Sequence, residues 1–161
     1  MQAKEYIEKV QGSSVYSDWI NENPNYYLVH LFSMTGHNIQ VGYYNKDEDK
    51  VVTFVIGEEI TRNPPEESFK ESGTIPQLEF EKVQLDIGEA FEEAKSLQEK
   101  EYPKELLDKK MLILQNFEGQ PVYNITLITK ALNFINIKVS AVDGSVISHK
   151  RNSIMDLKKS D

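Results

Sequence analysis

Histidine side chains are the first groups in this chain to consider for catalysis or metal binding. The three histidines, His30, His37 and His149, lack the H-x-x-x-H type of spacing that brings two imidazoles onto one metal ion. His30 alternates with apolar neighbours in a predicted strand, which favours a solvent-facing strand residue over a ligand or base. The sequence contains no G-x-S-x-G, P-loop or G-x-G-x-x-G pattern. Familiar catalytic and nucleotide-binding chemistry is therefore unsupported.

Carboxylates are the second reactive class. Residues 47–49 (DED) could gather oxygen ligands for a hard cation, but they lack the spacing of a calcium-binding loop, and a solvated turn explains them better. Glu92 with Glu93, and the acidic residues of 99–101, could form acid–base pairs, yet adjacent residues on a helix do not face one another. We therefore expect no metal, no cofactor, no catalytic residue and no enzymatic activity. A hydrolase that uses dispersed carboxylates is the catalytic alternative.

Composition excludes several partners. The 161 residues carry a net charge of −8, and the basic stretches are too short for a nucleic-acid footprint, so we expect no nucleic-acid partner. Cysteine is absent, which excludes disulfides and thiolate chemistry. No segment approaches the roughly 20 apolar residues that cross a bilayer, and the N-terminus lacks the apolar core of a signal peptide. We expect an acidic, soluble chain that does not insert into a membrane, with its native compartment left open.

Two sequence phrases occur twice in the chain. Residues 27–33 (YLVHLFS) and 38–45 (NIQVGYYN) are matched by residues 123–129 (YNITLIT) and 136–143 (NIKVSAVD). The offsets are 96 and 98 residues, so the later copy needs only two extra residues between its strands. One duplicated module is the economical explanation. A repeated framework without evident reactive groups favours binding over catalysis.

Periodicity predicts the elements of each module. Helical spacing is found over residues 2–11, and again from a capping box at Asp86 and Glu89 to about residue 100. Strand signals cover residues 26–34, 39–44, 50–56, 111–117, 122–129, 134–141 and 145–148. We therefore predict an α+β fold of two repeated modules, each with a helix packed on an antiparallel sheet. The predicted divisions are a first module at 1–62, a linker at 63–77, a second module at 78–155 and a flexible tail at 156–161.

Four residues are assigned to turns. Gly119 and Pro121 belong to the connection between two predicted strands, and Asp143 with Gly144 forms a hairpin-type turn. We interpret these four residues as structural.

The second half of the chain resembles the PepSY family. The resemblance covers roughly residues 79–150 and rests on helix residues Ala90 and Ala94, on the strand phrase GQPVYNITL (119–127) and on the hairpin phrase IKVSAVDGSVI (137–147). It departs at Ser140, where the family usually has an acidic residue, and at Asp143. The first half matches only through its similarity to the second, because Lys46 replaces the turn glycine.

That resemblance implies a small cystatin-like unit with a helix on an antiparallel sheet. Such units are frequently in tandem and often extracytoplasmic. They restrain peptidases or bind other proteins, and they are not enzymes as a rule.

Aromatic residues concentrate in the first half. Adjacent residues of a strand point to opposite faces, so one ring of each neighbouring tyrosine pair is expected to point outward. An outward aromatic strip is typical of a protein-binding face, and the alternative is that these rings cover a helix or the other module. The candidate partner-binding residues are Tyr16, Trp19, Tyr26, Tyr27, Tyr43 and Tyr44.

These observations favour a non-enzymatic protein-interaction or peptidase-regulatory module. Its expected partner is a protein, such as a peptidase or a component of the cell envelope. A small-ligand or peptide-binding protein is the alternative, and a hydrolase is less favoured. Only the family resemblance points to an extracytoplasmic location.

Overall fold

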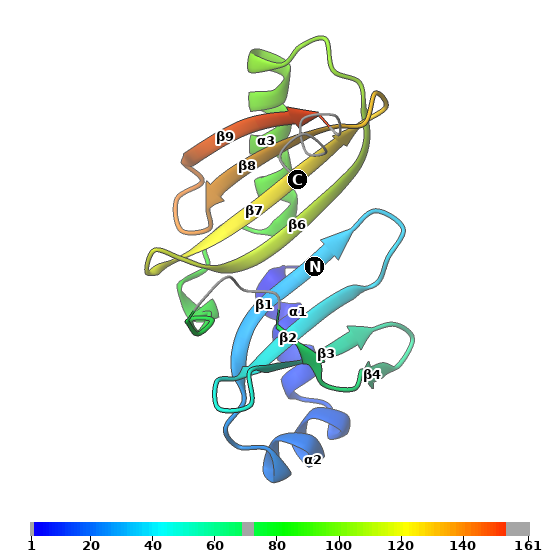
Figure 1. Ribbon diagram of the computed structural model, residues 1–161, viewed down its shortest axis with the longest axis vertical. Helices are drawn as coiled ribbons and strands as arrows, with labels where there is room; N and C mark the ends of the chain where they lie inside the picture. Colours follow the sequence, from blue (N-terminus) through cyan, green and yellow to red (C-terminus); the bar gives the residue numbers. More distant parts are fainter. Residues whose placement is uncertain (1, 69–72, 154–161) are drawn as a thin grey trace.

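The computed structural model describes residues 2–68 and 73–153, which form three α-helices, one 3-10 turn and nine strands (Figure 1). The helical elements are α1 (Ala3–Gln11), α2 (Ser14–Glu22), η1 (Phe80–Lys82) and α3 (Ile87–Glu101). The strands of the first half are β1 (Tyr27–Met34), β2 (Ile39–Asn45), β3 (Lys50–Ile56), β4 (Ile60–Arg62) and β5 (Glu66–Glu67). Those of the second half are β6 (Leu107–Phe117), β7 (Gln120–Thr129), β8 (Asn133–Ser140) and β9 (Val146–Ser153). The predicted α+β class is confirmed.

All nine strands belong to one antiparallel sheet. Its order is β4-β3-β2-β1-β6-β7-β8-β9, and β5 pairs with β3 beside this path. The contact between β1 and β6 joins residues of the two predicted modules, so both ranges build the same sheet. The helices lie on one face, with α1 behind β1 and β2 and α3 behind β7 and β8 (Figure 1). Duplication of a module, and its boundaries, stay predictions, and the predicted tail lies outside the described residues.

Side chains alternate along each strand, so each strand directs one set toward the helices and the other set toward the helix-free face. Leu31 of β1 lies opposite Leu114 of β6, and both are fully buried on the helix side. They belong to a single apolar cluster that extends from α1 in the first half to Val139 in the second. The next residues along each strand, Phe32 and Ile113, are also opposite one another but point to the helix-free face. A single core therefore holds both halves of the chain together.

Capping side chains set the limits of the helices. The predicted first helix is confirmed as α1, but the chain then forms α2, which the sequence analysis missed. The hydroxyl of Ser13 accepts a hydrogen bond from the backbone N–H of Tyr16 at 3.2 Å, so a residue expected to end one helix caps the next. The predicted capping box is present in α3, where Glu89 N–H donates to Asp86 at 2.8 Å.

The predicted linker is part of the sheet structure rather than a free connection. Its described residues, 63–68 and 73–77, are called the crossing segment here. Strand β5 pairs with β3, the Tyr27 hydroxyl donates to the Ile75 carbonyl, and the Asn116 side chain donates to the Gln77 carbonyl at 3.1 Å. Immediately after it, Leu78 N–H donates to the Leu28 carbonyl at 2.9 Å. Both ends of the crossing segment are therefore bonded to the strands beneath it.

The residues assigned to turns occupy the ends of second-half strands. Gly119 and Gly144 have φ values of 87° and 80°, a conformation that favours glycine. The Asp143 carboxylate accepts a hydrogen bond from Ser145 N–H at 2.9 Å. Pro121 lies in β7, and its carbonyl accepts from Ala141 N–H at 3.0 Å. All four residues make backbone or turn contacts.

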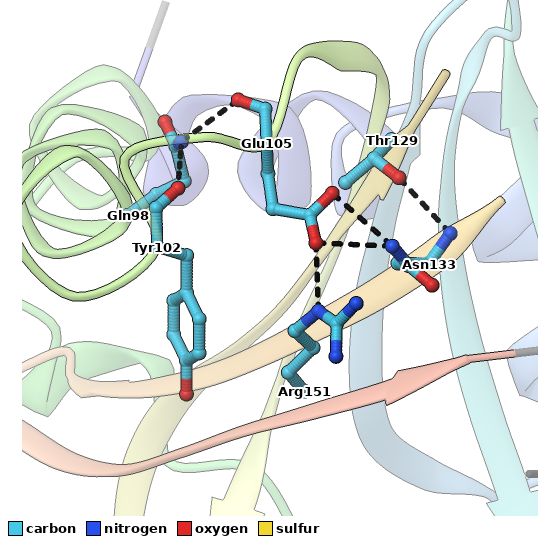
Figure 2. A network of polar contacts seen from close by, with 6 residues as sticks. All are labelled: Gln98, Tyr102, Glu105, Thr129, Asn133 and Arg151. Atoms are coloured by element: carbon cyan, nitrogen blue, oxygen red, sulfur yellow. Dashed lines mark hydrogen bonds and ion pairs between the residues drawn. The ribbon is translucent and has the colours of Figure 1, made fainter. Parts of the chain in front are cut away.

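A polar network anchors the end of α3 (Figure 2). The side-chain amide of the buried Gln98 donates to the Tyr102 carbonyl at 2.9 Å and to the Glu105 carbonyl at 3.2 Å. These bonds satisfy carbonyl groups beyond the end of the helix, where the regular helical pattern has stopped. They fix the path by which the chain enters β6.

The carboxylate of Glu105 extends this network to the sheet edge. It accepts hydrogen bonds from the Asn133 amide at 3.0 and 3.2 Å and from the Arg151 Nε at 2.7 Å. Asn133 is itself held by its backbone N–H, which donates to the Thr129 hydroxyl at 2.9 Å. Glu105 thereby ties the loop after α3 to β8 and to β9 at the sheet edge.

Replacing Glu105 with alanine should lower the free energy of unfolding by about 1–3 kcal/mol, because charged hydrogen bonds are lost and Asn133 loses its partner. Hydrogen bonds from Arg151 and Asn133 lower the pKa of Glu105. Its contribution is thus present above the carboxyl's unfolded pKa and is lost as pH falls through the folded pKa. Urea unfolding should be measured at a series of acidic pH values. The free energy of unfolding of E105A should fall less steeply with falling pH than that of the unchanged protein.

Glu101 supplies the control because it is exposed at the end of α3. E101A should unfold like the unchanged protein at every pH. Equal unfolding midpoints for E105A and E101A would show that the Glu105 network does not stabilise the fold.

Candidate functional site on the helix-free face of the sheet

Four of the six predicted partner-binding aromatics lie together inside the core. Trp19 of α2 is 4.8 Å from Tyr26 and 5.8 Å from Tyr43, measured between ring centroids. Tyr16 is 5.2 Å from Tyr43 and is partly buried, whereas the other three rings are buried. The hydroxyl of Tyr43 accepts from the Gln11 side chain at 3.1 Å, and burial raises the pKa of this tyrosine. These rings attach α1 and α2 to the sheet.

The remaining two aromatics lie on the helix-free face. Tyr27 and Tyr44 pack edge to face at 5.8 Å, on neighbouring strands. The Tyr27 hydroxyl donates a hydrogen bond to the Ile75 carbonyl. The Tyr44 hydroxyl donates to the Asp49 carboxylate, which also accepts a hydrogen bond from the Ser68 hydroxyl at 2.8 Å. Tyr44 is fully buried, although it points away from the helices.

The prediction that aromatic rings form an exposed strip is therefore wrong for four residues, which are buried: Trp19, Tyr26, Tyr43 and Tyr44. The tyrosines of each strand pair do point to opposite faces, but both faces are covered at these positions. Helices cover one side, and the crossing segment covers the other. The alternative weighed from the sequence, that the rings lie beneath other elements, describes their packing.

Among the described residues, the part of the helix-free face that no other segment covers is centred on the junction of β1 and β6. Phe32 lies opposite Ile113, and Met34 lies opposite Met111, and all four side chains are partly exposed. Neutral polar residues surround this apolar centre on β2, β6, β7 and β8. They are Gln40, Gln115, Asn124, Thr126 and Asn136.

A pocket of about 540 Å³ opens on this face beside the apolar centre. Its floor is formed by β1, β2, β3 and β6, and its wall by the crossing segment. The lining consists of Gln40, Val51, Thr53, Glu66, Glu67, Ser68, Ile75, Gln115, His30, Phe32 and Ile113. Apolar atoms supply most of its lining surface, as is usual for ligand sites.

His30 is held in the pocket by its neighbour on β2. It lies directly opposite Gly42, and a Cβ atom at position 42 would come within 2.3 Å of the imidazole. The imidazole therefore occupies the space that a side chain at position 42 would need. Burial lowers the pKa of His30 to about 4, so the ring is neutral at pH 7 and offers one N–H donor and one acceptor nitrogen.

Three further polar side chains line the pocket. The side chains of Gln40, Thr53 and Gln115, like the His30 ring, form no hydrogen bond within residues 2–68 and 73–153. Their polar atoms keep contact with solvent, because none is both buried and unpartnered. The pocket thus combines an apolar floor with uncharged donors and acceptors that are free to bind a ligand.

Sequence reasoning missed most of this site. His30 was expected to face solvent, and it does lie on the helix-free face, but Gly42 lets its ring pack down and the crossing segment shields it. Alternation along residues 27–34 and 111–117 was the available signal for Phe32 and Ile113. Their proximity depends on the β1–β6 pairing, which no local pattern reveals.

Two features were not found among the residues that the structure describes. Among those residues no three histidine, aspartate or glutamate side chains gather into a possible metal cluster. None of the helices described is both long and apolar enough to cross a bilayer.

Comparison with known proteins yields one likeness of fold. No protein-family model matches the chain, and no curated protein sequence matches it. The chain is similar to a crystal structure of a candidate lipoprotein from Clostridium difficile 630, with a TM-score of 0.55 and 14% sequence identity. The match covers 84% of this chain and 89% of the other. At that identity the likeness shows the fold alone.

The partly buried imidazole of His30 should make stability depend on pH. A folded pKa near 4, below the unfolded value of about 6.5, means that the unfolded chain takes up a proton first as pH falls. Stability is therefore lost between about pH 6.5 and 4, by at most about 3 kcal/mol. H30F should remove this loss, because phenylalanine keeps a ring over Gly42 but does not titrate. Chemical unfolding at several pH values measures this loss of stability in H30F and in the unchanged protein.

H37F serves as the matched control, since His37 lies in an exposed turn. It should keep the pH dependence of the unchanged protein. An equal slope in H30F and in the unchanged protein would mean that His30 is not the titrating group.

Trp19 provides a test of the aromatic core. W19A should lower the free energy of unfolding by about 3–5 kcal/mol, as expected when a large buried ring is removed from a core. Urea unfolding measures the loss. In the unchanged protein, acrylamide should quench the fluorescence of this tryptophan weakly. Strong quenching with little loss of stability in W19A would instead indicate an exposed ring.

Proposed function

We propose that this protein acts by binding a protein partner rather than by catalysis, and that the partner contacts the helix-free face of the sheet. The observation that carries the proposal is the partly exposed apolar centre formed by Phe32, Met34, Met111 and Ile113. It lies on rigid strands whose opposite face is packed against the core. A surface of this kind needs little ordering when a partner binds.

The chemistry around the apolar centre also favours a protein partner. Protein interfaces commonly have an apolar centre that is depleted in charge and a polar rim that stays near water. Here the rim carries amides and a hydroxyl, including Asn124, Thr126 and Asn136. Methionine adds to this fit, because its flexible side chain adapts to a partner's shape. Basic residues adjoin this rim: Lys138 donates to Asn136 at 3.3 Å, and Lys150 lies opposite Asn136 on β9.

Two likenesses support a partner in the cell envelope. The second half of the chain resembles PepSY units, which restrain peptidases or bind proteins, often outside the cytoplasm. The similar fold belongs to a candidate lipoprotein. We therefore propose a peptidase or another envelope component as the partner, and a pair of PepSY-like modules as the origin of the fold.

The second candidate is a small-ligand or peptide-binding protein. Its support is the pocket, whose volume of about 540 Å³ lies within the range of roughly 300–1,000 Å³ typical of small-molecule sites. Binding of a partner segment in that pocket would unite the two candidates.

The hydrolase alternative has weaker support. A site built from dispersed carboxylates needs two of them to converge on one substrate. Glu66 and Glu67 are the carboxylates in the pocket lining, but they are adjacent on β5 and therefore point to opposite sides of that strand. Glu67 is also paired with Lys50 at 3.0 Å.

The interface can be tested by adding one charge to its centre. We expect M111E to lose the partner that the unchanged protein retains from an envelope extract of the native organism, because a carboxylate in an apolar contact is desolvated without a counter-charge. V142E is the matched control, since Val142 is an exposed apolar residue in the turn before β9. Affinity capture followed by mass spectrometry gives the readout, with circular dichroism to verify folding.

Retention of the same partner by M111E and V142E would contradict the proposed surface. Turnover of a small substrate by the purified protein, lost in a pocket variant, would contradict the proposed class of function.

A further inference from the structure

The pocket differs from the rest of the helix-free face because it has a wall. Ser68 and Ile75 of the crossing segment stand beside a floor that includes Val51, Phe32 and Ile113. The crossing segment is bonded to the sheet on both sides of the pocket, through β5 at one end and through Tyr27 at the other. A ligand in the pocket would therefore contact apolar side chains from below and from one side. This arrangement suits a large apolar side chain better than a flat surface contact.

The polar groups of the pocket match the main chain of a peptide. A peptide unit carries one donor and one acceptor. The neutral His30 ring and the amides of Gln40 and Gln115 each supply both kinds of group, and none is committed within the described residues. Because none of these side chains is charged at pH 7, they can bond to an amide without leaving a buried charge unpaired. The pocket therefore fits an apolar side chain together with its flanking peptide groups.

The charge of the pocket determines which charge a suitable ligand carries. Among residues 2–68 and 73–153, the lining contains Glu66 and Glu67 but no lysine or arginine. Glu67 is partly neutralised by Lys50, whereas Glu66 has no ion-pair partner among the residues described. The whole chain carries a net charge of −8. An anionic ligand is disfavoured here, and a basic residue beside the apolar side chain is favoured.

We infer that the pocket under the crossing segment receives a large apolar or aromatic side chain from an extended partner segment that carries a basic residue next to it. This inference rests on the proposed function and adds the chemistry of the partner. The apolar side chain lies on Phe32, Val51 and Ile113, the adjoining peptide groups bond to Gln40, Gln115 and His30, and the basic residue lies near Glu66.

Synthetic peptides test this selectivity directly by isothermal titration calorimetry. The probe acetyl-KVFVK-amide should bind the full chain. Acetyl-KVAVK-amide should bind at least about tenfold more weakly, since burying an aromatic side chain is worth more than the 1.4 kcal/mol that gives a tenfold change. Acetyl-EVFVE-amide should also bind at least about tenfold more weakly, because its carboxylates are repelled by Glu66. Equal binding of the three peptides, or none by acetyl-KVFVK-amide at millimolar concentration, would overturn the inference. N-acetylphenylalaninamide binding as tightly as acetyl-KVFVK-amide would also overturn it, in favour of a small-molecule site.

Two substitutions test whether the peptide binds in the pocket. T53Y fills it from β3 without adding charge, and Q115W fills it from β6 should T53Y fail to fold. Either substitution should weaken the binding of acetyl-KVFVK-amide at least about tenfold, which is the effect of losing a contact worth 1.4 kcal/mol. V142Y is the control, because Val142 is exposed in the turn before β9 and lies outside the pocket. Unchanged binding by a folded T53Y or Q115W protein would overturn the inference.

Failure of this inference is distinguishable from failure of the proposed function. Met111 is outside the pocket lining, so loss of the native partner in M111E without any peptide selectivity would overturn the pocket assignment alone. Peptide selectivity together with partner retention in M111E would support the pocket and overturn the wider contact face.

Discussion

The pairing of β1 with β6 is the interaction on which the rest of the structure depends. It is the junction at which residues far apart in the sequence become one sheet, with Leu31 against Leu114 on one face and Phe32 against Ile113 on the other. The first pair closes the core beneath the helices. The second pair creates the centre of the proposed contact face. Without this pairing, each half would expose a sheet edge and an incomplete core, which small domains tolerate poorly.

Covering only one face with helices has a functional consequence. The helix side is filled by aromatic and aliphatic side chains. Within the described part of the chain, the other face is covered where the crossing segment lies over Tyr27 and Tyr44. The remaining area keeps apolar residues at its centre and amides around them. One interaction therefore explains both the stability of the core and the position of the pocket, because the pocket floor needs strands from both halves.

Local patterns predicted much of the fold and little of the site. Alternation located β1, β2 and β3 to within about a residue, and the Asp86–Glu89 capping box marked the start of α3. Helix α2 was missed because glycine and serine at residues 12–14 are typical of a helix end, although Ser13 in fact caps a second helix. The six aromatics were named as candidates for a partner-binding face, with burial beneath other elements as the alternative, because period-two alternation shows which side a ring points to, but not which element covers that side.

The single sheet and its contact face both depend on the register of β1 against β6, which places Met34 directly opposite Met111. Directly opposed side chains of an antiparallel pair have Cβ atoms about 4.5–5.5 Å apart. The most direct measurement is a nuclear Overhauser experiment on protein labelled at its methionine methyl groups. We predict a cross-peak between the methyl groups of Met34 and Met111. Its absence, with both signals assigned and the protein folded, would contradict a single continuous sheet and the contact face built on it.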